Sequence, residues 1–155
     1  MRKPKYQAFI TYECTMVQVT SLNLIENTEY EHEYLSTGIY LDGEGEYEPV
    51  GFVLSDAKLR QYTGLKDRNG KEIYEGDILG TDNQEPLHVE FSDKHAGFVF
   101  VDEFDKYGTT KYSAKDIFYE SFEVIGNIYE NPELLLRYWP RIYRKLKHTT
   151  RKECT

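Results

Sequence analysis

The alternation of apolar and polar residues along this chain predicts a series of short β-strands. Apolar side chains occupy every second position of residues 5–12, and Val17 and Val19 repeat the pattern within residues 15–20. Alternation of this kind is typical of strands with one buried face, so the two runs predict an opening hairpin. Pro49 marks an edge strand, because it has no N–H to donate into a sheet. Further strands are expected at residues 38–41, 47–54, 78–79, 87–91, 98–101, 112, 117–119 and 122–129.

Two short helices are expected between these strands. Ser55 is a residue type that caps helix starts, and it precedes a predicted helix from Asp56 to Tyr62. Asn131 and Pro132 begin a second helix, because Asn is a good N-cap and Pro loses no hydrogen bond in a first helical turn. The close spacing of the many short strands indicates a small barrel or sandwich rather than a parallel α/β sheet.

Composition agrees with a compact, aromatic-rich β protein. The 155 residues are 39% hydrophobic, yet they include 14 Tyr and 8 Phe. Each aromatic side chain buries roughly 150–250 Å², so a core of few residues can still be large in area. Disordered chains have few aromatics, and a chain of this length fits a single domain. We expect one domain over residues 1–136 and a basic C-terminal extension over residues 137–155.

The charge is distributed unevenly along the chain. The net charge is −8, but the segment from Arg137 to Thr155 holds seven basic residues against one acid, Glu153. Of the 19 basic and 27 acidic residues in the whole chain, 12 and 26 therefore belong to residues 1–136. An acidic body argues against non-specific DNA binding through the domain itself. Asymmetry of this kind is typical of an interaction arm.

The basic extension holds the candidate partner-binding residues, and three uses of it stay open. Its apolar residues could dock on the domain with the charges in water, or the charges could dock on the acidic body of the same or a neighbouring subunit. Nucleic-acid binding is the third use and is not favoured over the first two. The candidate residues are Arg141, Arg144, Lys145, Lys147 and Arg151.

The sequence predicts a protein of the cytoplasm that does not enter a membrane. No apolar run approaches the roughly 20 residues that span a bilayer, and the N-terminus lacks the apolar stretch of a signal peptide. Cys14 and Cys154 stand far apart with no CxxC motif. Two lone thiols suit a reducing compartment better than a disulfide scaffold, although a bridge between the two remains open.

Residues that could perform chemistry do not fall into a recognisable pattern. Asp42, Glu44 and Glu46 are spaced like calcium ligands, but the twelfth position of such a loop would be Val53 instead of an acid. The four histidines have no paired spacing and no cysteine partner, which disfavours zinc. We therefore expect no metal and no cofactor. A hydrolase or nuclease remains the weakest alternative, and it would need a pocket that gathers Asp77, Asp56 or Asp102.

The segment Tyr62–Leu79 (YTGLKDRNGKEIYEGDIL) is the most distinctive in the chain. Asn69-Gly70 favours the positive backbone angles of a tight turn. Gly76-Asp77 predicts a second turn, whose aspartate would accept backbone N–H groups. Because a strand follows instead of a helix, the charged residues around Asp67 read as a solvated turn and not as a phosphate cradle.

Three pieces of the sequence resemble the YopX family of phage and prophage proteins. They are the opening Lys5–Phe9 (KYQAF), the segment Tyr62–Leu79, and the closing stretch Phe122–Leu135 (FEVIGNIYENPELL). The resemblance implies a mainly β fold related to SH3-like barrels, a tendency to self-associate and no enzyme class. We therefore expect an SH3-like barrel or roll with two short helices. Its expected function is that of a non-enzymatic interaction module that forms homo-oligomers in the bacterial host cytoplasm. The 14 Tyr lead us to expect self-association through tyrosine-rich surfaces and sheet edges.

Overall fold

The computed structural model describes residues 4–23, 34–40, 47–53, 56–81, 84–103 and 108–136. They divide into two compact units: unit 1 ends at Gln61 and unit 2 begins at Tyr62. Each unit contains an antiparallel sheet, so the expectation of a mainly β fold is confirmed. Whether residues 1–136 fold as one domain stays a prediction.

Unit 1 is built on the predicted opening hairpin. Its strands follow the order β4-β3-β2-β1-β5, and each pair of neighbours is antiparallel. β4 lies at the edge of the sheet, as Pro49 indicated. The strands are β1 (Tyr6–Ile10), β2 (Thr15–Asn23), β3 (Tyr34–Tyr40), β4 (Tyr47–Val53) and the first half of β5 (Ala57–Lys66).

The core of unit 1 follows from strand register. Ala8 lies opposite Val17 on β2 and opposite Leu59 on β5, so the three side chains share one face. Ala8 and Ile10 are fully buried, and Ala57 joins them in one apolar cluster. The alternation read from the sequence thus selects the residues of this cluster.

The helix predicted from Asp56 to Tyr62 is wrong, because this segment is strand β5. Residues 57–61 are good helix formers, but Ala57 to Gln61 pair along their whole length with β1. Pairing and burial in a sheet override such local preference. Arg60 is 2% exposed and donates to Oε1 of Gln7, its partner across the β1–β5 ladder, over 3.2 Å.

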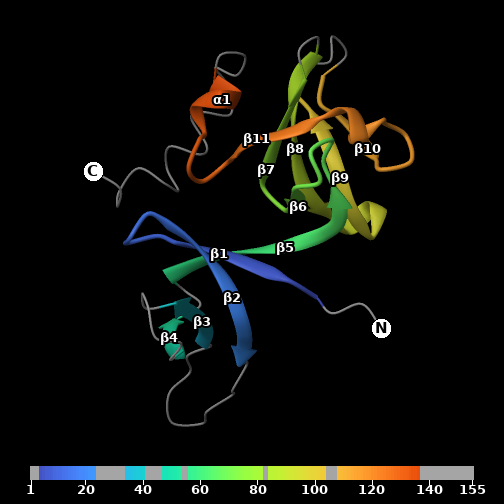
Figure 1. Ribbon diagram of the computed structural model, residues 1–155. Coiled ribbons are helices and arrows are strands. Elements are labelled where there is room, and N and C mark those ends of the chain that lie inside the picture. The colour runs from blue at the N-terminus through green and yellow to red at the C-terminus, as the bar shows by residue number, and fades with distance from the viewer. Residues whose placement is uncertain are drawn as a thin grey trace. The chain divides into compact units, whose positions relative to one another are not determined.

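Unit 2 contains a five-stranded sheet with the order β10-β9-β8-β7-β11 (Figure 1). The second half of β5 pairs with the short strand β6 beside this sheet. Two 3₁₀ turns, η2 and η3, precede β9 and β11. The bounds are β6 (Glu72–Tyr74), β7 (Asp77–Thr81), β8 (Gln84–Ser92), η2 (Asp93–His95), β9 (Gly97–Asp102), β10 (Thr110–Ser113), η3 (Tyr119–Ser121), β11 (Glu123–Asn127) and α1 (Glu133–Leu136).

The five-stranded sheet has apolar side chains on both faces. Leu79, Val89 and Phe100 pack on one face together with Ile73 and Phe122, which come from β6 and the end of η3. On the other face, Ile78 packs with Leu135 and Leu134 of α1. The predicted second helix is therefore present, and it covers the β7–β11 side of the sheet.

The predicted barrel closure is not seen, since within each sheet of the described residues the first and last strands do not pair with each other. The predicted hairpin of β8 and β9 is confirmed, with Val89 opposite Phe100. The strand expected at residues 117–119 is wrong, because η3 begins at Tyr119. None of the helices among the described residues is long and apolar enough to span a bilayer.

The covalent state of Cys14 differs from the interpretation that the chain has two lone thiols. Cys14 is disulfide-bonded, and it adopts a positive φ of 51° in the turn between β1 and β2. The other cysteine in the sequence, Cys154, lies outside the described residues.

Candidate functional site

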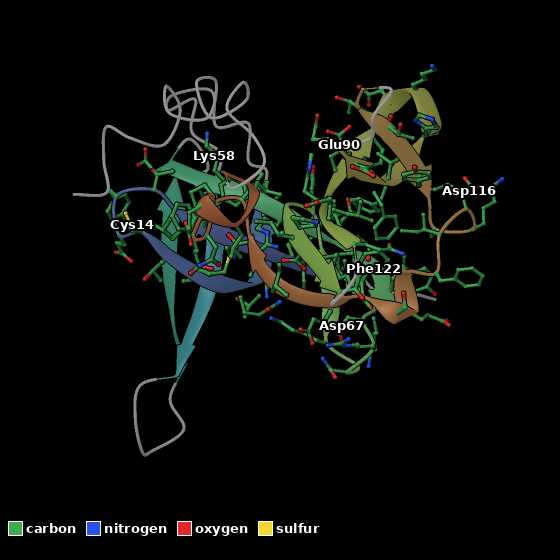
Figure 2. All side chains as sticks on the ribbon, turned by 90° about the horizontal axis from the view of Figure 1, so that it is seen from above. Cys14, Lys58, Asp67, Glu90, Asp116 and Phe122 are labelled. Carbon is green, nitrogen blue, oxygen red and sulfur yellow. The ribbon has the colours of Figure 1, made fainter. Side chains whose placement is uncertain are left out.

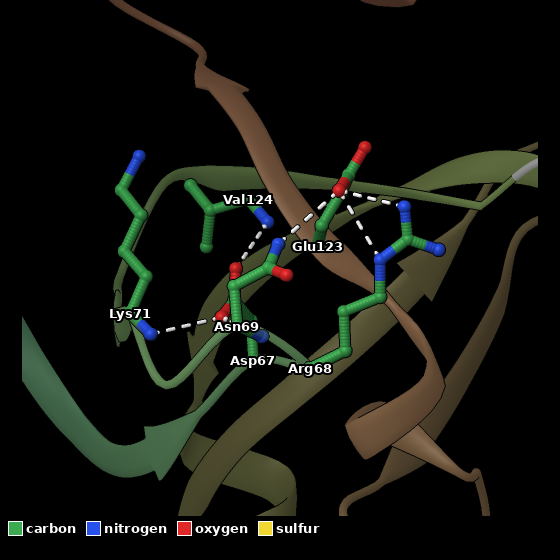
Figure 3. Close-up of polar contacts among 6 residues, drawn as sticks. All are labelled: Asp67, Arg68, Asn69, Lys71, Glu123 and Val124. Atoms are coloured by element: carbon green, nitrogen blue, oxygen red, sulfur yellow. Dashed lines mark hydrogen bonds and ion pairs between the residues drawn. The ribbon is translucent and has the colours of Figure 1, made fainter.

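The distinctive segment begins with a turn around the carboxylate of Asp67 (Figure 3). Oδ1 of Asp67 accepts the backbone N–H of Asn69 over 2.8 Å and that of Lys71 over 2.9 Å. Its backbone carbonyl accepts the N–H of Gly70 over 2.9 Å, and Gly70 has a φ of +80°. The turn is thus an Asx-type turn closed by glycine, as the Asn-Gly pair predicted.

The same carboxylate also fastens the turn to an edge strand. Oδ2 of Asp67 accepts the N–H of Val124 over 2.9 Å. Next to it, the N–H of Arg68 donates to the carbonyl of Phe122 over 3.0 Å. β11 is the edge of the five-stranded sheet, so the turn satisfies part of its outer backbone. We call the contacts of Asp67 and Arg68 with residues 122–124 the turn clamp.

The reading of this turn as solvated is wrong for Asp67, which is only 6% exposed. Burial raises the pKa of a carboxyl group, but three backbone N–H donors and nearby Lys71 act in the opposite direction. The net effect is a lowered pKa for Asp67. A carboxylate whose two oxygens are occupied by three N–H groups is suited to holding the backbone in place.

The outer side of the turn carries a small charged group. One oxygen of Glu123 accepts from Arg68 through Nη2 at 2.7 Å and Nε at 3.1 Å, and from Nδ2 of Asn69 at 3.3 Å. Arg68 and Glu123 are each about one-third exposed. Ion pairs of this kind contribute about 0–1 kcal/mol to stability. The pair therefore adds little to the stabilisation of the turn by the Asp67 hydrogen bonds.

The prediction that Gly76-Asp77 forms a turn whose aspartate accepts a backbone N–H group is confirmed. Oδ2 of Asp77 accepts the N–H of Tyr74 over 2.7 Å, and Asp77 is 5% exposed. The N–H of Gly76 donates to the carbonyl of Val89, and its carbonyl accepts from Ile128. Gly76 has a φ of +78°, and a Cβ there would come within 3.1 Å of the Tyr129 ring.

A separate polar group lies on β8, β9 and β10. Cross-strand register places His88, Val101 and Lys111 in one row. Glu90 lies between the side chains of His88 and Lys111: Oε2 is 3.8 Å from Nε2 of His88, and Oε1 contacts Nζ of Lys111. Burial lowers the pKa of His88, against the opposing effect of the Glu103 and Glu90 carboxylates. His88 is buried, whereas His95 is exposed.

The carboxylates that a hydrolase would need are distributed over different elements. Asp77 and Asp102 lie on β7 and β9, with β8 between these strands, and Asp56 belongs to unit 1. Asp77 is engaged by its own turn. Among the described residues, no group of three or more His, Cys, Asp or Glu side chains could hold a metal ion.

The sequence did not predict which individual aromatic and aliphatic side chains are exposed. Phe118 is 88% exposed, Tyr12 56%, Phe91 47% and Ile125 41%. Phe91 meets Phe98 edge to face, with ring centroids 5.5 Å apart. A hydrophobic pattern alone would bury all of these residues, and nothing in the residues around Phe118 signals that it points to solvent.

Several residues that were weighed as metal ligands or partner contacts lie outside the described residues. These are the calcium-like acids Asp42, Glu44 and Glu46, the histidines His32 and His148, and the basic residues Arg141, Arg144, Lys145, Lys147 and Arg151.

Comparison with known proteins supplies the family. No curated protein matches the sequence. Among solved structures, the chain is similar to protein EF1440 from Enterococcus faecalis, with 26% sequence identity and a TM-score of 0.57. That similarity covers 87% of this chain and 99% of EF1440. The family model described as YopX protein matches residues 5–136. The match includes the turn clamp and both sheets, and this chain therefore belongs to the YopX family.

Proposed function

We propose that this chain is a non-enzymatic interaction protein of phage or prophage origin that acts by self-association in the host cytoplasm. The observation that carries the proposal is the set of large apolar side chains held in water by ordered backbone, above all Phe118 at 88% exposure. Exposed aromatic residues are enriched where proteins bind one another, because they bury a large area at low entropic cost.

The polar residues of the distinctive segment support the proposal because they are occupied in fixing the backbone. Asp67 and Asp77 each accept backbone N–H groups of the chain itself. Their carboxylates are therefore used to fix turns, which leaves surface apolar groups as the better candidates for function. Tyr and Phe at the surface suit a half-wet interface between proteins.

The SH3-like character of unit 2 is part of the same proposal. Strands β7 to β10 form a meander, a 3₁₀ turn follows, and β11 returns to pair with β7. This strand order supports kinship with SH3-like rolls, which use exposed aromatic residues to bind other proteins.

Self-association is tested by the mass of the full chain in solution. Light scattering at micromolar concentration should give a mass above that of one chain, and the mass should fall on dilution as weakly held copies separate. A mass equal to one chain at every concentration would contradict the proposal.

Nucleic-acid binding through the basic extension is the second candidate, favoured by the charge contrast between residues 137–155 and the rest of the chain. It predicts binding that weakens steeply with salt, since each phosphate contact releases a counterion. A low-salt gel-shift assay with the full chain and with Arg141→Glu/Arg144→Glu tests it. Absence of any shift with the wild type would remove this candidate.

A further inference from the structure

We infer that the Asp116 carboxylate blocks the outer edge of β10, so that this strand does not pair with β10 of a second copy of the chain. The inference rests on the proposed self-association and adds a device that limits it. With this edge blocked, copies meet through side-chain surfaces, and their association stays reversible.

β10 is an edge strand of unit 2. It is the first strand in the order of the five-stranded sheet, and β9 is its one strand neighbour among the described residues. The outer side of an edge strand presents N–H and C=O groups that can pair with a strand of another molecule. Two identical edges related by a two-fold axis can pair antiparallel. β10 of a second copy therefore fits this edge when the edge is open.

Asp116 occupies the backbone groups at the end of β10. The N–H of Ser113 donates to Oδ2 of Asp116 over 3.2 Å, and its carbonyl accepts the N–H of Asp116 over 2.9 Å. The hydroxyl of Ser113 donates to the same Oδ2 atom. We call these three bonds between Ser113 and Asp116 the edge cap.

The edge cap also identifies the next outward backbone group of the strand. Residues along an antiparallel strand alternate between bonding their neighbour and facing the outer side. Ser113 uses its N–H and C=O on Asp116, so Lys111, two positions earlier, directs its own pair of groups to the same outer side. An added strand needs both positions, and the cap removes one of them.

The carboxylate of the edge cap is held in its charged form. The Ser113 hydroxyl lowers the pKa of Asp116 below its ordinary value; burial opposes this, and the Ser113 N–H and Lys115 add to it. Hydrogen bonds to a charged acceptor are stronger than those between neutral groups. A neutral carbonyl of an incoming strand therefore competes poorly for the Ser113 N–H.

The opposite edge of the sheet, β11, is covered by several contacts at once. The turn clamp covers it through the carboxylate of Asp67 and through the N–H of Arg68. The ladder with β7 also shifts register between Val124 and Gly126, and such irregularities protect sheet edges. Asp116 lies on the outside of unit 2, away from Asp67 of the turn clamp (Figure 2). Its cap is therefore a separate device, and a single substitution tests it.

Asp116→Ala in the full chain removes the carboxylate and leaves the sequence of β10 intact. It should lower the concentration at which sedimentable, thioflavin-binding assemblies form by at least about tenfold, because a hydrogen bond to a charged group no longer competes with strand pairing. The Lys111 and Ser113 amides should become protected from hydrogen exchange in these assemblies. Asp93→Ala removes the same charge from an exposed residue of η2 and should assemble at the wild-type concentration. Circular dichroism before assembly checks that both variants are folded.

A proline in β10 tests whether this strand is the one that pairs. Proline has no N–H to donate and is tolerated in an edge strand where that group faces solvent. Asp116→Ala/Lys111→Pro should therefore return the assembly concentration toward that of wild type. Asp116→Ala/Lys111→Ala, which keeps the N–H at position 111, is the matched control and should assemble like Asp116→Ala.

The outcomes separate the inference from the proposed function. Assembly of Asp116→Ala at the wild-type concentration, or an equal gain in Asp93→Ala, would overturn the edge cap. A gain in Asp116→Ala that Lys111→Pro leaves unchanged would overturn β10 as the pairing edge. A wild-type mass of one chain would overturn the proposed self-association, and these variants would still decide whether Asp116 blocks the edge.

Discussion

Asp67 is the residue on which the distinctive segment depends most. Its carboxylate accepts three backbone N–H groups, from Asn69, Lys71 and Val124. Asn at this position keeps one acceptor oxygen and turns the other into a donor, which cannot accept from Val124. A buried N–H left without its acceptor costs about 1–3 kcal/mol.

Asp67→Asn should therefore lower the free energy of unfolding by about 1–3 kcal/mol in urea titrations at neutral pH. Hydrogen exchange at the Val124 amide should also become faster. Asp93→Asn, an exposed aspartate in η2, is the control and should change neither quantity. Equal stability of Asp67→Asn and wild type would contradict the role of the turn clamp.

The lowered pKa of Asp67 gives this contribution a pH dependence. Its pKa lies below the ordinary 3.8 in the folded chain, so the unfolded chain takes up a proton first as pH falls. The stabilisation is complete above pH 3.8 and is lost as pH falls through the folded-state pKa. Unfolding free energies of Asp67→Asn should show a shallower decline below pH 4 than those of wild type, and parallel curves would argue against it.

His88 predicts that the free energy of unfolding also depends on pH at higher pH values. Burial holds its pKa below the ordinary 6.5, with Glu103 and Glu90 opposing and Lys111 assisting. Below pH 6.5 the unfolded chain binds a proton that the folded chain does not, so stability falls as pH falls through this range. His88→Gln should flatten the slope of unfolding free energy between pH 6.5 and 5. An unaltered slope in His88→Gln would show that His88 is not its source.

Residue-scale prediction from the sequence succeeded where the interaction is local. The Asp67 turn and the Asp77 turn both join groups within a few positions of one another, and both are recognisable from their glycines. The contact of Asp67 with Val124 spans 57 positions, and no local pattern indicates it. The exposure of Phe118 was unpredictable for the same reason, because it depends on which neighbours the fold buries.

At the scale of elements, two glycines allow the energetic cost of a left-handed backbone to be distinguished from the cost of crowding neighbouring side chains. Gly70 and Gly76 have nearly equal φ values of +80° and +78°. A Cβ at Gly70 meets nothing within 4 Å, whereas at Gly76 it would lie 3.1 Å from Tyr129 and 3.3 Å from Ile128. Gly70→Ala should cost about 1–2 kcal/mol for the left-handed backbone alone.

Gly76→Ala should lower the free energy of unfolding by the same backbone cost as Gly70→Ala. It should lose roughly 1–3 kcal/mol more, because the side chains of Tyr129 and Ile128 must also move. Thermal or urea unfolding of both variants measures the difference. Equal losses would mean that the close approach at Gly76 is relieved without cost.

Strand β5 shows why element prediction failed where it did. Residues 57–61 favour a helix locally, yet they pair with β1 in unit 1, and residues 62–66 pair with β6 in unit 2. A strand shared between two sets of partners is determined by those partners. Hairpins such as β8–β9 were predictable, because both strands and their connection lie within one short stretch.

At the scale of the whole molecule, the proposed function gives two groups of residues different tasks. The turns of the YopX segment bend and fasten the backbone of unit 2, and the exposed aromatic residues are available to a partner. Substitutions in the first group should change stability, and substitutions in the second should change association. Family membership, which the sequence motif indicated, is compatible with this division and does not by itself assign an activity.

Sedimentation equilibrium of Asp67→Asn and Phe118→Ser, both as full chains at a temperature where both are folded, tests this division most directly. We predict that Asp67→Asn retains the concentration-dependent mass of wild type, and that Phe118→Ser has the mass of one chain. Loss of association in Asp67→Asn together with its retention in Phe118→Ser would contradict the account, since the turn would then serve binding and the aromatic surface would not.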